Sequence, residues 1–336
     1  PPRNDNIALA ILKKAISNQP MSNRTYAIIG TGAIGGFYGA KLQKAGHRVS
    51  FLLRSDYHHV AANGLIVESV DGDIILPEVD AYNDVKKMPS SDVVIVALKA
   101  TQNHLLAELL PPLINENSVV LLLQNGINIE PEITQIIGDK ILIGGLCFIC
   151  SNKVGPGKIR HIDYGTISIG QYATNYQAAG VTEKMREIAD DFETAGVPIQ
   201  LNEDLFLARW KKLVWNIPYN GLSVVLNART DEIMANADTR FLAEELMREV
   251  QLGAKSCGRI IGDRFIEEML DHTDKMNPYL TSMKLDYDGK RPLEVEAIVG
   301  NALGMAKEAG VDLPKISVLY RQLKFLDVRN RQESTA

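Results

Sequence analysis

Two kinds of hydrophobic pattern divide the chain. In the first part, short runs of mostly apolar residues alternate with longer stretches in which apolar residues recur every three or four positions. The short runs predict strands at residues 26–29, 48–53, 93–98 and 119–123, with a helix over 34–45 between the first two. Strands that are apolar along their whole length and separated by helices are typical of a parallel sheet buried on both faces.

The pattern changes near residue 204. Before it, three further β-rich segments are expected to extend the sheet, at residues 141–151, 157–161 and 166–170. After it, helical periodicity dominates, with predicted helices at residues 205–225, 239–257 and 292–309. The predicted fold class is therefore α/β, with an N-terminal Rossmann domain built on a doubly wound parallel sheet and a second, all-helical C-terminal domain.

The domain boundaries are expected to follow this change of pattern. A chain of 336 residues, 46% of them hydrophobic, is long enough to bury the cores of two domains. We assign residues 21–203 to the Rossmann domain and residues 204–330 to a helical domain that carries substrate binding and catalysis. Residues 1–20 are interpreted as an upstream extension or an expression remnant with no role in the chemistry.

Composition narrows the possible functions. A formal net charge of -5 argues against nucleic acid, which requires a basic face. No apolar run approaches the length of a membrane span, and the start of the chain lacks the features of a secretory signal. Three cysteines do not make a disulfide framework, so a cytoplasmic location is expected. The expected partner is a small molecule, with no nucleic acid and no membrane.

Cys147 and Cys150 form a Cys-x-x-Cys motif within a predicted strand. Residues three apart in a strand point to opposite faces, and the third cysteine, Cys257, is over a hundred residues away. No second motif of this kind exists to complete a zinc site. We interpret both as buried strand cysteines, with redox or metal use as the alternative, and expect no metal site.

A glycine-rich loop joins the first predicted strand to the first predicted helix. It reads Gly30-Thr31-Gly32-Ala33-Ile34-Gly35, a Gly-x-Gly-x-x-Gly motif. The first glycine permits a tight turn, the second lets the backbone approach a pyrophosphate, and the third allows close helix–strand packing. The motif alone is a weak signal, but its place between a strand and a helix predicts a dinucleotide site.

The end of the second predicted strand indicates which dinucleotide binds. Enzymes that use NAD usually have an acidic residue there, which bonds the ribose 2′-hydroxyl. This chain has Arg54 instead. A guanidinium can pair with a 2′-phosphate, which a carboxylate would repel. We therefore predict NADP(H) as the cofactor, with a solvated surface arginine as the alternative interpretation.

Two polar residues follow later predicted strands. Lys99 ends the strand at 93–98, and Asn125 follows the strand at 119–123. Ligands of doubly wound sheets bind outside the carboxyl ends of the strands, so both side chains are expected at the crevice between cofactor and substrate. Either could instead be a turn residue, since Asn125-Gly126 is a common turn pair.

A polar stripe marks the predicted helix at 205–225. Lys212, Asn216 and Asn220 are spaced by four residues and share one face of an otherwise apolar helix. Burying an ammonium and two amides is costly unless they have partners, so the stripe suggests a ligand surface. The alternative is a polar seam satisfied by a neighbouring helix. Lys211 lies about 100° around the helix and should point elsewhere.

Together these residues resemble the ketopantoate reductase family. The resemblance rests on the strand–glycine loop–helix unit, Leu98-Lys99-Ala100, Gln124-Asn125-Gly126, the Lys212-x3-Asn216-x3-Asn220 stripe, and Ser282 with Glu294 and Gly300 at matching distances. It covers about residues 24–325 in order. The family fold, an N-terminal Rossmann domain and a helical C-terminal domain with the active site between them, agrees with the hydrophobic pattern.

The resemblance also implies roles for individual residues. Lys212 would be the general acid, and Glu294 the acidic partner that positions it and closes over the cofactor. Glu296 competes with Glu294 but lies about 200° away on a helix, and the register of the flanking motif favours Glu294. Lys99 would lie beside the cofactor. The remaining expected contacts to substrate or nicotinamide are Asn125, Asn216, Asn220 and Ser282.

The function implied is reduction of 2-dehydropantoate (ketopantoate) to (R)-pantoate by NADPH, a step of pantothenate and coenzyme A biosynthesis, with a homodimer as one possible assembly. Three positions depart from the family pattern: Tyr279, Thr230 and Val299. These departures do not affect the predicted reaction type, but they allow a substrate other than ketopantoate. The alternatives are a reductase of another branched 2-oxo acid and an NADPH-binding sensor without turnover.

Overall fold

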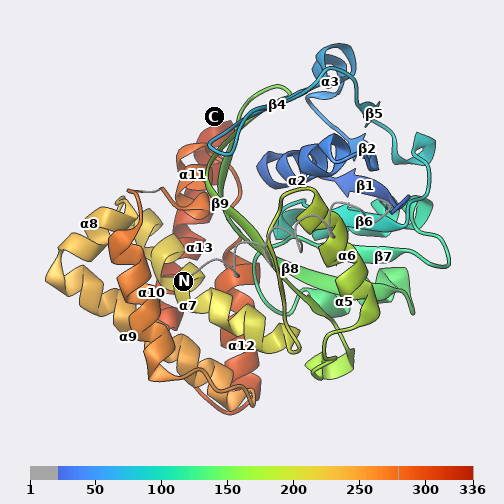
Figure 1. Cartoon of the computed structure of the whole chain (residues 1–336). Coiled ribbons are helices and arrows are strands. Elements are labelled where there is room, and N and C mark those ends of the chain that lie inside the picture. Colours follow the sequence, from blue (N-terminus) through green and yellow to red (C-terminus); the bar gives the residue numbers. More distant parts are fainter. Residues whose placement is uncertain (1–21, 279, 336) are drawn as a thin grey trace, which may run out of the picture.

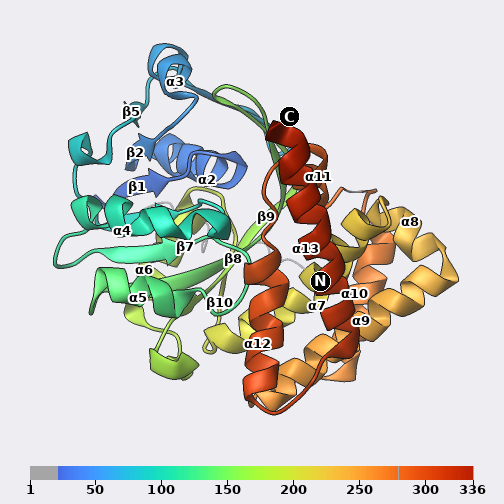
Figure 2. The same cartoon turned by 180° about the vertical axis from the view of Figure 1, so that it is seen from behind.

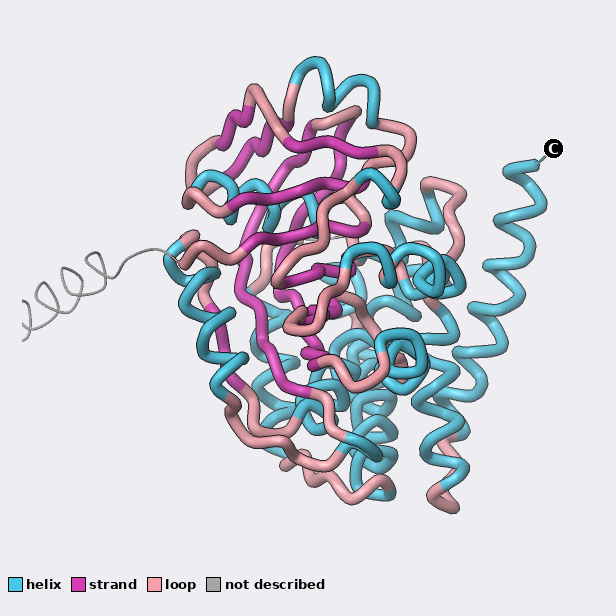
Figure 3. Tube along the Cα trace, turned by 90° about the vertical axis from the view of Figure 1, so that its right-hand side faces the viewer, coloured by secondary structure: helices cyan, strands magenta, loops and turns pink. Residues whose placement is uncertain are grey.

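The structure is a computed structural model that describes residues 22–278 and 280–335. The extension expected at residues 1–20 lies outside these ranges, and so does Tyr279. A strand-rich part, in which helices pack on a sheet, lies beside a part built from helices (Figure 1). Figure 3 shows the same division from the side. No helix within the described ranges is both long and apolar enough to cross a membrane.

A ten-stranded sheet forms the first part, in the order β4-β3-β9-β8-β7-β6-β1-β2-β5, with β10 beside β9. Its strands are β1 Thr25–Ile29, β2 Arg48–Leu52, β3 Leu65–Ser69, β4 Ile74–Leu76, β5 Asp80–Tyr82, β6 Val93–Val96, β7 Val119–Leu122, β8 Ile141–Gly155, β9 Lys158–Gln171 and β10 Ile199–Leu201. Strand β1 pairs in parallel with both β2 and β6, so the winding of the chain reverses beside β1. In doubly wound sheets this switch point is where ligands bind.

The sheet is not parallel throughout, which differs from the expectation for this domain. Strands β8 and β9 form a long antiparallel hairpin, and β3 and β4 form a short one. The segments expected at 157–161 and 166–170 are one continuous strand, β9, joined to β8 by a tight turn in which Gly157 has a φ of +62°. A connection this short allows only antiparallel pairing, because a parallel pair needs a long crossover.

Helices bury both faces of the sheet. Alternate residues of β1 point to opposite sides, with Ile28 in one core and Ile29 in the other. The first core includes side chains of α2 (Ala33–Lys44) and α6 (Glu183–Thr194), and the second includes those of α4 (Leu106–Leu109) and α5 (Glu130–Ile137). Shorter elements complete this part: α3 Tyr57–Asn63 and the 3-10 turns η1 Val85–Lys87, η2 Ala100–Leu105, η3 Pro111–Leu113 and η4 Thr174–Tyr176.

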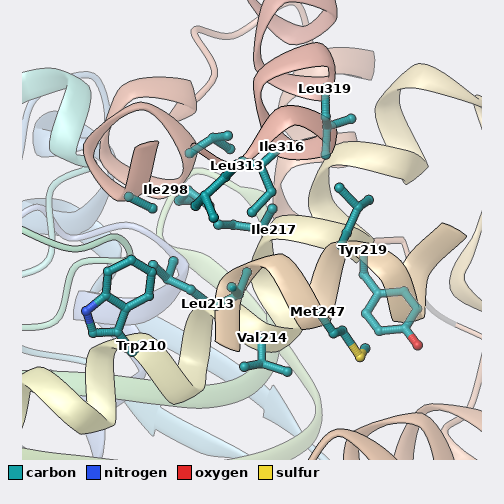
Figure 4. Close-up of a cluster of buried hydrophobic side chains, with 14 of the residues drawn as sticks. Trp210, Leu213, Val214, Ile217, Tyr219, Met247, Ile298, Leu313, Ile316 and Leu319 are labelled. Carbon is teal, nitrogen blue, oxygen red and sulfur yellow. The ribbon is translucent and has the colours of Figure 1, made fainter. Parts of the chain in front are cut away.

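The second part packs around helix α7 (Leu205–Val225), whose bounds match the prediction. Figure 4 shows Trp210, Leu213 and Ile217 of α7 inside the helical core, with Ile316 and Leu319 from the last helix packed above them. The other helices are α8 Thr230–Ala235, α9 Ala237–Ser256, α10 Asp263–Lys275, α11 Ser282–Asp288, α12 Asn301–Glu308 and α13 Pro314–Thr335. The helix expected at 292–309 is a π-helical turn, η5 (Glu296–Gly300), leading into α12. Helix α7 packs against strands β8 and β9 and so joins the two parts, which Figure 2 shows from behind.

Candidate active site

The glycine-rich loop lies at the switch point of the sheet. Gly30 has a φ of +95°, and a Cβ there would lie 2.6 Å from the backbone nitrogen of Leu98, so only glycine fits. A Cβ on Gly35 would lie 2.3 Å from the Gly30 carbonyl oxygen, which requires close packing of loop and helix. Within the described part of the chain, a Cβ on Gly32 would meet no atom within 4 Å, and no side chain caps the first turn of α2. This open space beside helix amides fits a pyrophosphate.

Side chains beside the loop define the end where a ribose would lie. Thr31 Oγ1 donates a 2.9 Å hydrogen bond to the last backbone carbonyl of β2, and Ala33 and Ile34 open helix α2. Arg54 lies just beyond β2 and is exposed, with no ion pair to any residue in the described part of the chain. An exposed guanidinium at this point is free to meet a phosphate.

Asp56, two residues after Arg54, already has hydrogen-bond partners within the protein. Lys153 Nζ lies 2.6 Å from its carboxylate, and the Gly157 N–H donates to it over 3.0 Å. Burial would raise the pKa of Asp56, but these hydrogen bonds hold it below its ordinary value. Its charge is therefore compensated within the protein and does not compete for Arg54.

Lys99 reaches across from the sheet to the helical part. It follows β6 at the start of η2, and its Nζ forms an ion pair with the buried carboxylate of Asp286 on α11. Arg291 donates to the other oxygen of Asp286 over 2.9 Å. Lys99 thus stands at the carboxyl edge of the sheet, as expected, but it also joins the two parts of the molecule.

Glu294 and Asn125 meet at the same edge. The Glu294 carboxylate is buried, accepts the Ala100 N–H over 2.9 Å, and hydrogen-bonds the Asn125 side chain. Burial raises the pKa of Glu294, although the nearby Lys99 opposes this. The competing carboxylate, Glu296, points away from this edge and pairs with Lys324 at 2.5 Å.

The structure does not bring Glu294 and Lys212 together as expected. Lys212 Nζ donates to the Cys147 carbonyl oxygen on β8 over 3.1 Å and lies 3.6 Å from the ring centre of Phe148. Among the described residues, no ion pair involves Lys212. The oxygens of Glu294 are instead directed toward Ala100 and Asn125, at the ends of other strands.

The polar stripe of α7 has the geometry expected of a ligand surface. Burial lowers the pKa of Lys212 to about 8, because an ammonium loses hydration there. Asn216 Nδ2 and Asn220 Oδ1 are buried and have no hydrogen-bond partner in the described part of the chain. Buried polar atoms without partners are rare, so the alternative of a seam satisfied by a neighbouring helix does not account for these two. Lys211 lies on another face, 5.3 Å from the ring centre of Phe265.

Ser282 stands near the end of this stripe. It is exposed and opens α11, next to Thr281, whose hydroxyl lies 2.7 Å from Ser223 Oγ on α7. Ser223 Oγ in turn donates to the Asn220 backbone carbonyl over 3.0 Å. This chain of bonds holds the start of α11 beside the Asn220 end of the stripe.

Two family models match the chain. One, described as ketopantoate reductase PanE/ApbA, matches residues 26–174, and the other, described as the C-terminal part of that family, matches residues 204–327. The chain belongs to the ketopantoate reductase family. Its members are NADP-dependent oxidoreductases, and the predicted Rossmann fold with a helical C-terminal part is confirmed by their structures.

Individual members of the ketopantoate reductase family are closely similar to this chain. A 2-dehydropantoate 2-reductase of Nostoc is 65% identical over 311 residues, which cover 93% of this chain and 98% of that protein. The crystal structure of the Geobacter metallireducens 2-dehydropantoate 2-reductase shares 39% identity at a TM-score of 0.86, covering 89% of this chain and 99% of that one. The Methylococcus capsulatus enzyme shares 33% identity at a TM-score of 0.83, with 91% and 97% covered.

Nothing in the sequence indicated a buried ion pair between Arg209 and Glu130 in this member of the ketopantoate reductase family. Arg209 on α7 donates to Glu130 Oε1 over 2.6 and 2.9 Å and to the Gln124 carbonyl oxygen over 2.6 Å. Both side chains are at most 1% exposed. The partners are 79 residues apart, and no local pattern relates them. The pair fixes the turn that carries Asn125.

The cysteines of the motif form no disulfide among the described residues, and neither does Cys257. Burial raises the pKa of Cys147 to about 12, so its thiol is neutral at ordinary pH. Within the described ranges, no group of three or more His, Cys, Asp or Glu side chains is placed to hold a metal ion.

Proposed function

We propose that this chain catalyses the NADPH-dependent reduction of 2-dehydropantoate to (R)-pantoate. The observation that carries the proposal is its 65% identity with the Nostoc 2-dehydropantoate 2-reductase over 98% of that protein. The Lys212–Asn216–Asn220 stripe, with its unpartnered buried amide atoms, supports it from the structure.

Lys212 is the general acid in this proposal. The bound nicotinamide supplies a hydride to the C2 ketone, and negative charge then develops on the ketone oxygen. Lys212 donates a proton to this oxygen, which stabilises the charge as it forms. With a pKa of about 8, the amine is mostly protonated at neutral pH and is a stronger acid than an exposed lysine.

The amides and Ser282 hold the substrate in this proposal. Asn216 Nδ2 donates to the substrate carboxylate, and Asn220 Oδ1 accepts from its hydroxyl, since a donor and an acceptor need opposite partners. Ser282 adds a hydroxyl at the Asn220 end. Holding both ends of a small oxo acid fixes the approach of its ketone and lowers the entropic cost of reaction.

The cofactor is held by the sheet edge. The Gly30–Gly35 loop would hold the pyrophosphate and Arg54 the 2′-phosphate, and Lys99, Asn125 and Glu294 would border the nicotinamide half. Of these contacts, the one to Arg54 alone separates NADPH from NADH, because the two cofactors differ only in the 2′-phosphate.

Arg54→Ala is therefore expected to weaken NADPH binding by about 10- to 100-fold, in line with the loss of a charge-assisted hydrogen-bonded pair. The affinity for NADH should change little. Titration calorimetry with each cofactor measures both effects. A wild-type preference for NADH, or equal losses for the two cofactors, would show that Arg54 does not read the 2′-phosphate.

The substrate is tested by NADPH oxidation across a panel of 2-oxo acids. Ketopantoate should give the highest kcat/KM, and 3,3-dimethyl-2-oxobutanoate, which lacks only the hydroxyl, a markedly lower one, because Asn220 then loses its partner. A higher kcat/KM with another branched 2-oxo acid would mean that this acid, and not ketopantoate, is the substrate. No turnover with any acid would favour the alternative of an NADPH-binding sensor.

A homodimer and a cytoplasmic location stay predictions. A dimeric ketopantoate reductase of Staphylococcus aureus is 22% identical to this chain at a TM-score of 0.76, a likeness that concerns the fold alone. Light scattering of the purified protein tests the assembly directly.

A further inference from the structure

Phe148 holds a position that the proposed mechanism leaves unused. Its ring centre lies 3.6 Å from Lys212 Nζ, and 40% of the residue is exposed. The only hydrogen bond from this ammonium to the described residues goes to the Cys147 carbonyl, one residue earlier on β8. An aromatic face and a carbonyl thus stand where a carboxylate was expected.

The β8–β9 hairpin is irregular at this residue. Phe148 pairs with Thr166 but Ile149 pairs with Tyr164, so Gly165 is an extra residue on β9. Tyr164 and Gly165 both have positive φ, +61° and +141°. Bulges of this kind change the direction of side chains and are common beside active sites.

The bulge is also held in place by helix α2. Tyr38 Oη on α2 donates to the Gly165 carbonyl oxygen over 3.2 Å, and both Tyr38 and Lys212 are fixed by buried helices. The ring on β8 and the ammonium on α7 are thus brought together by the fold, while α2 holds the bulge of β9 beside them.

We propose that Phe148 is a positioning residue for the proton donor, holding the Lys212 ammonium against its ring face and keeping it charged in a site without a paired carboxylate. The inference rests on the proposed role of Lys212. A cation over an aromatic face is attracted by the ring quadrupole, and the attraction grows as water is excluded.

The surrounding groups are consistent with this role. The titratable groups that act on Lys212 are the Cys147 and Cys150 thiols of β8. Burial raises the pKa of Cys147 to about 12, so that thiol is neutral where the enzyme works and supplies no negative charge. Burial alone favours the neutral amine, and the ring opposes it.

The test compares Phe148→Leu with Phe148→Tyr. Leucine keeps the apolar cover but has no π face, so the pKa of Lys212 should fall by about 0.5–1.5 pH units, while tyrosine should keep it close to wild type. Competitive acylation across pH, followed by mass spectrometry of the Lys212 peptide, measures this pKa without turnover. The alkaline limb of kcat for ketopantoate reduction should move by the same amount.

Phe265→Leu is the matched control, because Phe265 lies 5.3 Å from Lys211 on another face of the same helix. It should leave the pKa of Lys212 unchanged, and Phe148→Met serves as a second non-aromatic variant. An unchanged Lys212 pKa in both non-aromatic variants overturns the proposal. If that pKa falls while the limb of kcat stays fixed, Phe148 does position Lys212, but Lys212 is not the proton donor.

Discussion

Lys212→Ala should lower kcat for ketopantoate reduction by about 10²–10⁴-fold, the usual contribution of a general acid. Lys212 is the cation of the α7 stripe, and no ion pair ties it elsewhere among the described residues. The glycine loop and Arg54 lie on other elements, so NADPH affinity should stay within about twofold, a change smaller than the loss of one hydrogen bond. Steady-state kinetics and cofactor titration of the same preparation measure both quantities.

Lys211→Ala is the control, since it removes the same charge one residue away. Its ammonium faces Phe265 instead of the stripe, so its kcat should be near wild type. If Lys211→Ala lost activity while Lys212→Ala kept it, the assigned catalytic face would be wrong. If neither variant lost activity, another group would have to donate the proton.

The lowered pKa of Lys212 gives the wild-type reaction a pH signature. Reduction needs the ammonium, so kcat should fall as the pH rises through about 8, where the proton is lost. The reverse reaction, oxidation of pantoate, needs the free amine and should rise over the same range. Lys212→Ala should remove this transition from both directions.

The sequence predicted those elements of the fold whose own residues show a clear hydrophobic pattern. Strands β1, β2, β6 and β7 are short apolar runs, and the Gly30–Gly35 loop stands between a strand and a helix, so pattern alone located them. Strands β3, β4, β5 and β10 were not predicted. They have three to five residues, and β3, β5 and β10 pair with strands that are distant in the sequence, while β4 pairs with β3 at the edge of the sheet. The antiparallel hairpin was likewise missed, because direction depends on the turn at Gly157.

In the candidate site, too, local pattern located some residues, whereas the contacts between distant residues could not be predicted. Helical periodicity placed Lys212, Asn216 and Asn220 on one face, and the matching distances around Ser282 favoured Glu294 over Glu296. What surrounds Lys212 was not predictable, since Cys147 is 65 residues away and the direction of Phe148 depends on an irregularity in β9. The expectation that Glu294 would position the lysine came from resemblance, and in this structure the two do not meet.

The second large effect concerns stability and comes from the buried pair of Arg209 and Glu130. Arg209→Ala leaves the Glu130 carboxylate buried, and its one remaining donor among the described residues is the Tyr176 hydroxyl, at 2.5 Å. Removing one partner of a buried ion pair costs about 3–5 kcal/mol, because the remaining charge cannot be solvated. The free energy of unfolding, from urea titration, should fall by this amount. KM for the substrate should also rise, since the Gln124 carbonyl loses its partner beside Asn125.

Arg240 provides the matched comparison, because it pairs with Asp274 at 2.6 Å but both side chains are more than a third exposed. Arg240→Ala should cost less than about 1 kcal/mol, as exposed ion pairs do. The double variant Arg209→Met/Glu130→Gln tests the cause of the difference. Both variants lose the hydrogen bonds of Arg209, and an amide oxygen at position 130 can still accept from Tyr176. Removing both charges leaves none uncompensated, so the double variant should be more stable than Arg209→Ala. A double variant less stable than Arg209→Ala would mean that the bond from Tyr176 to the Glu130 carboxylate outweighs the cost of the isolated charge.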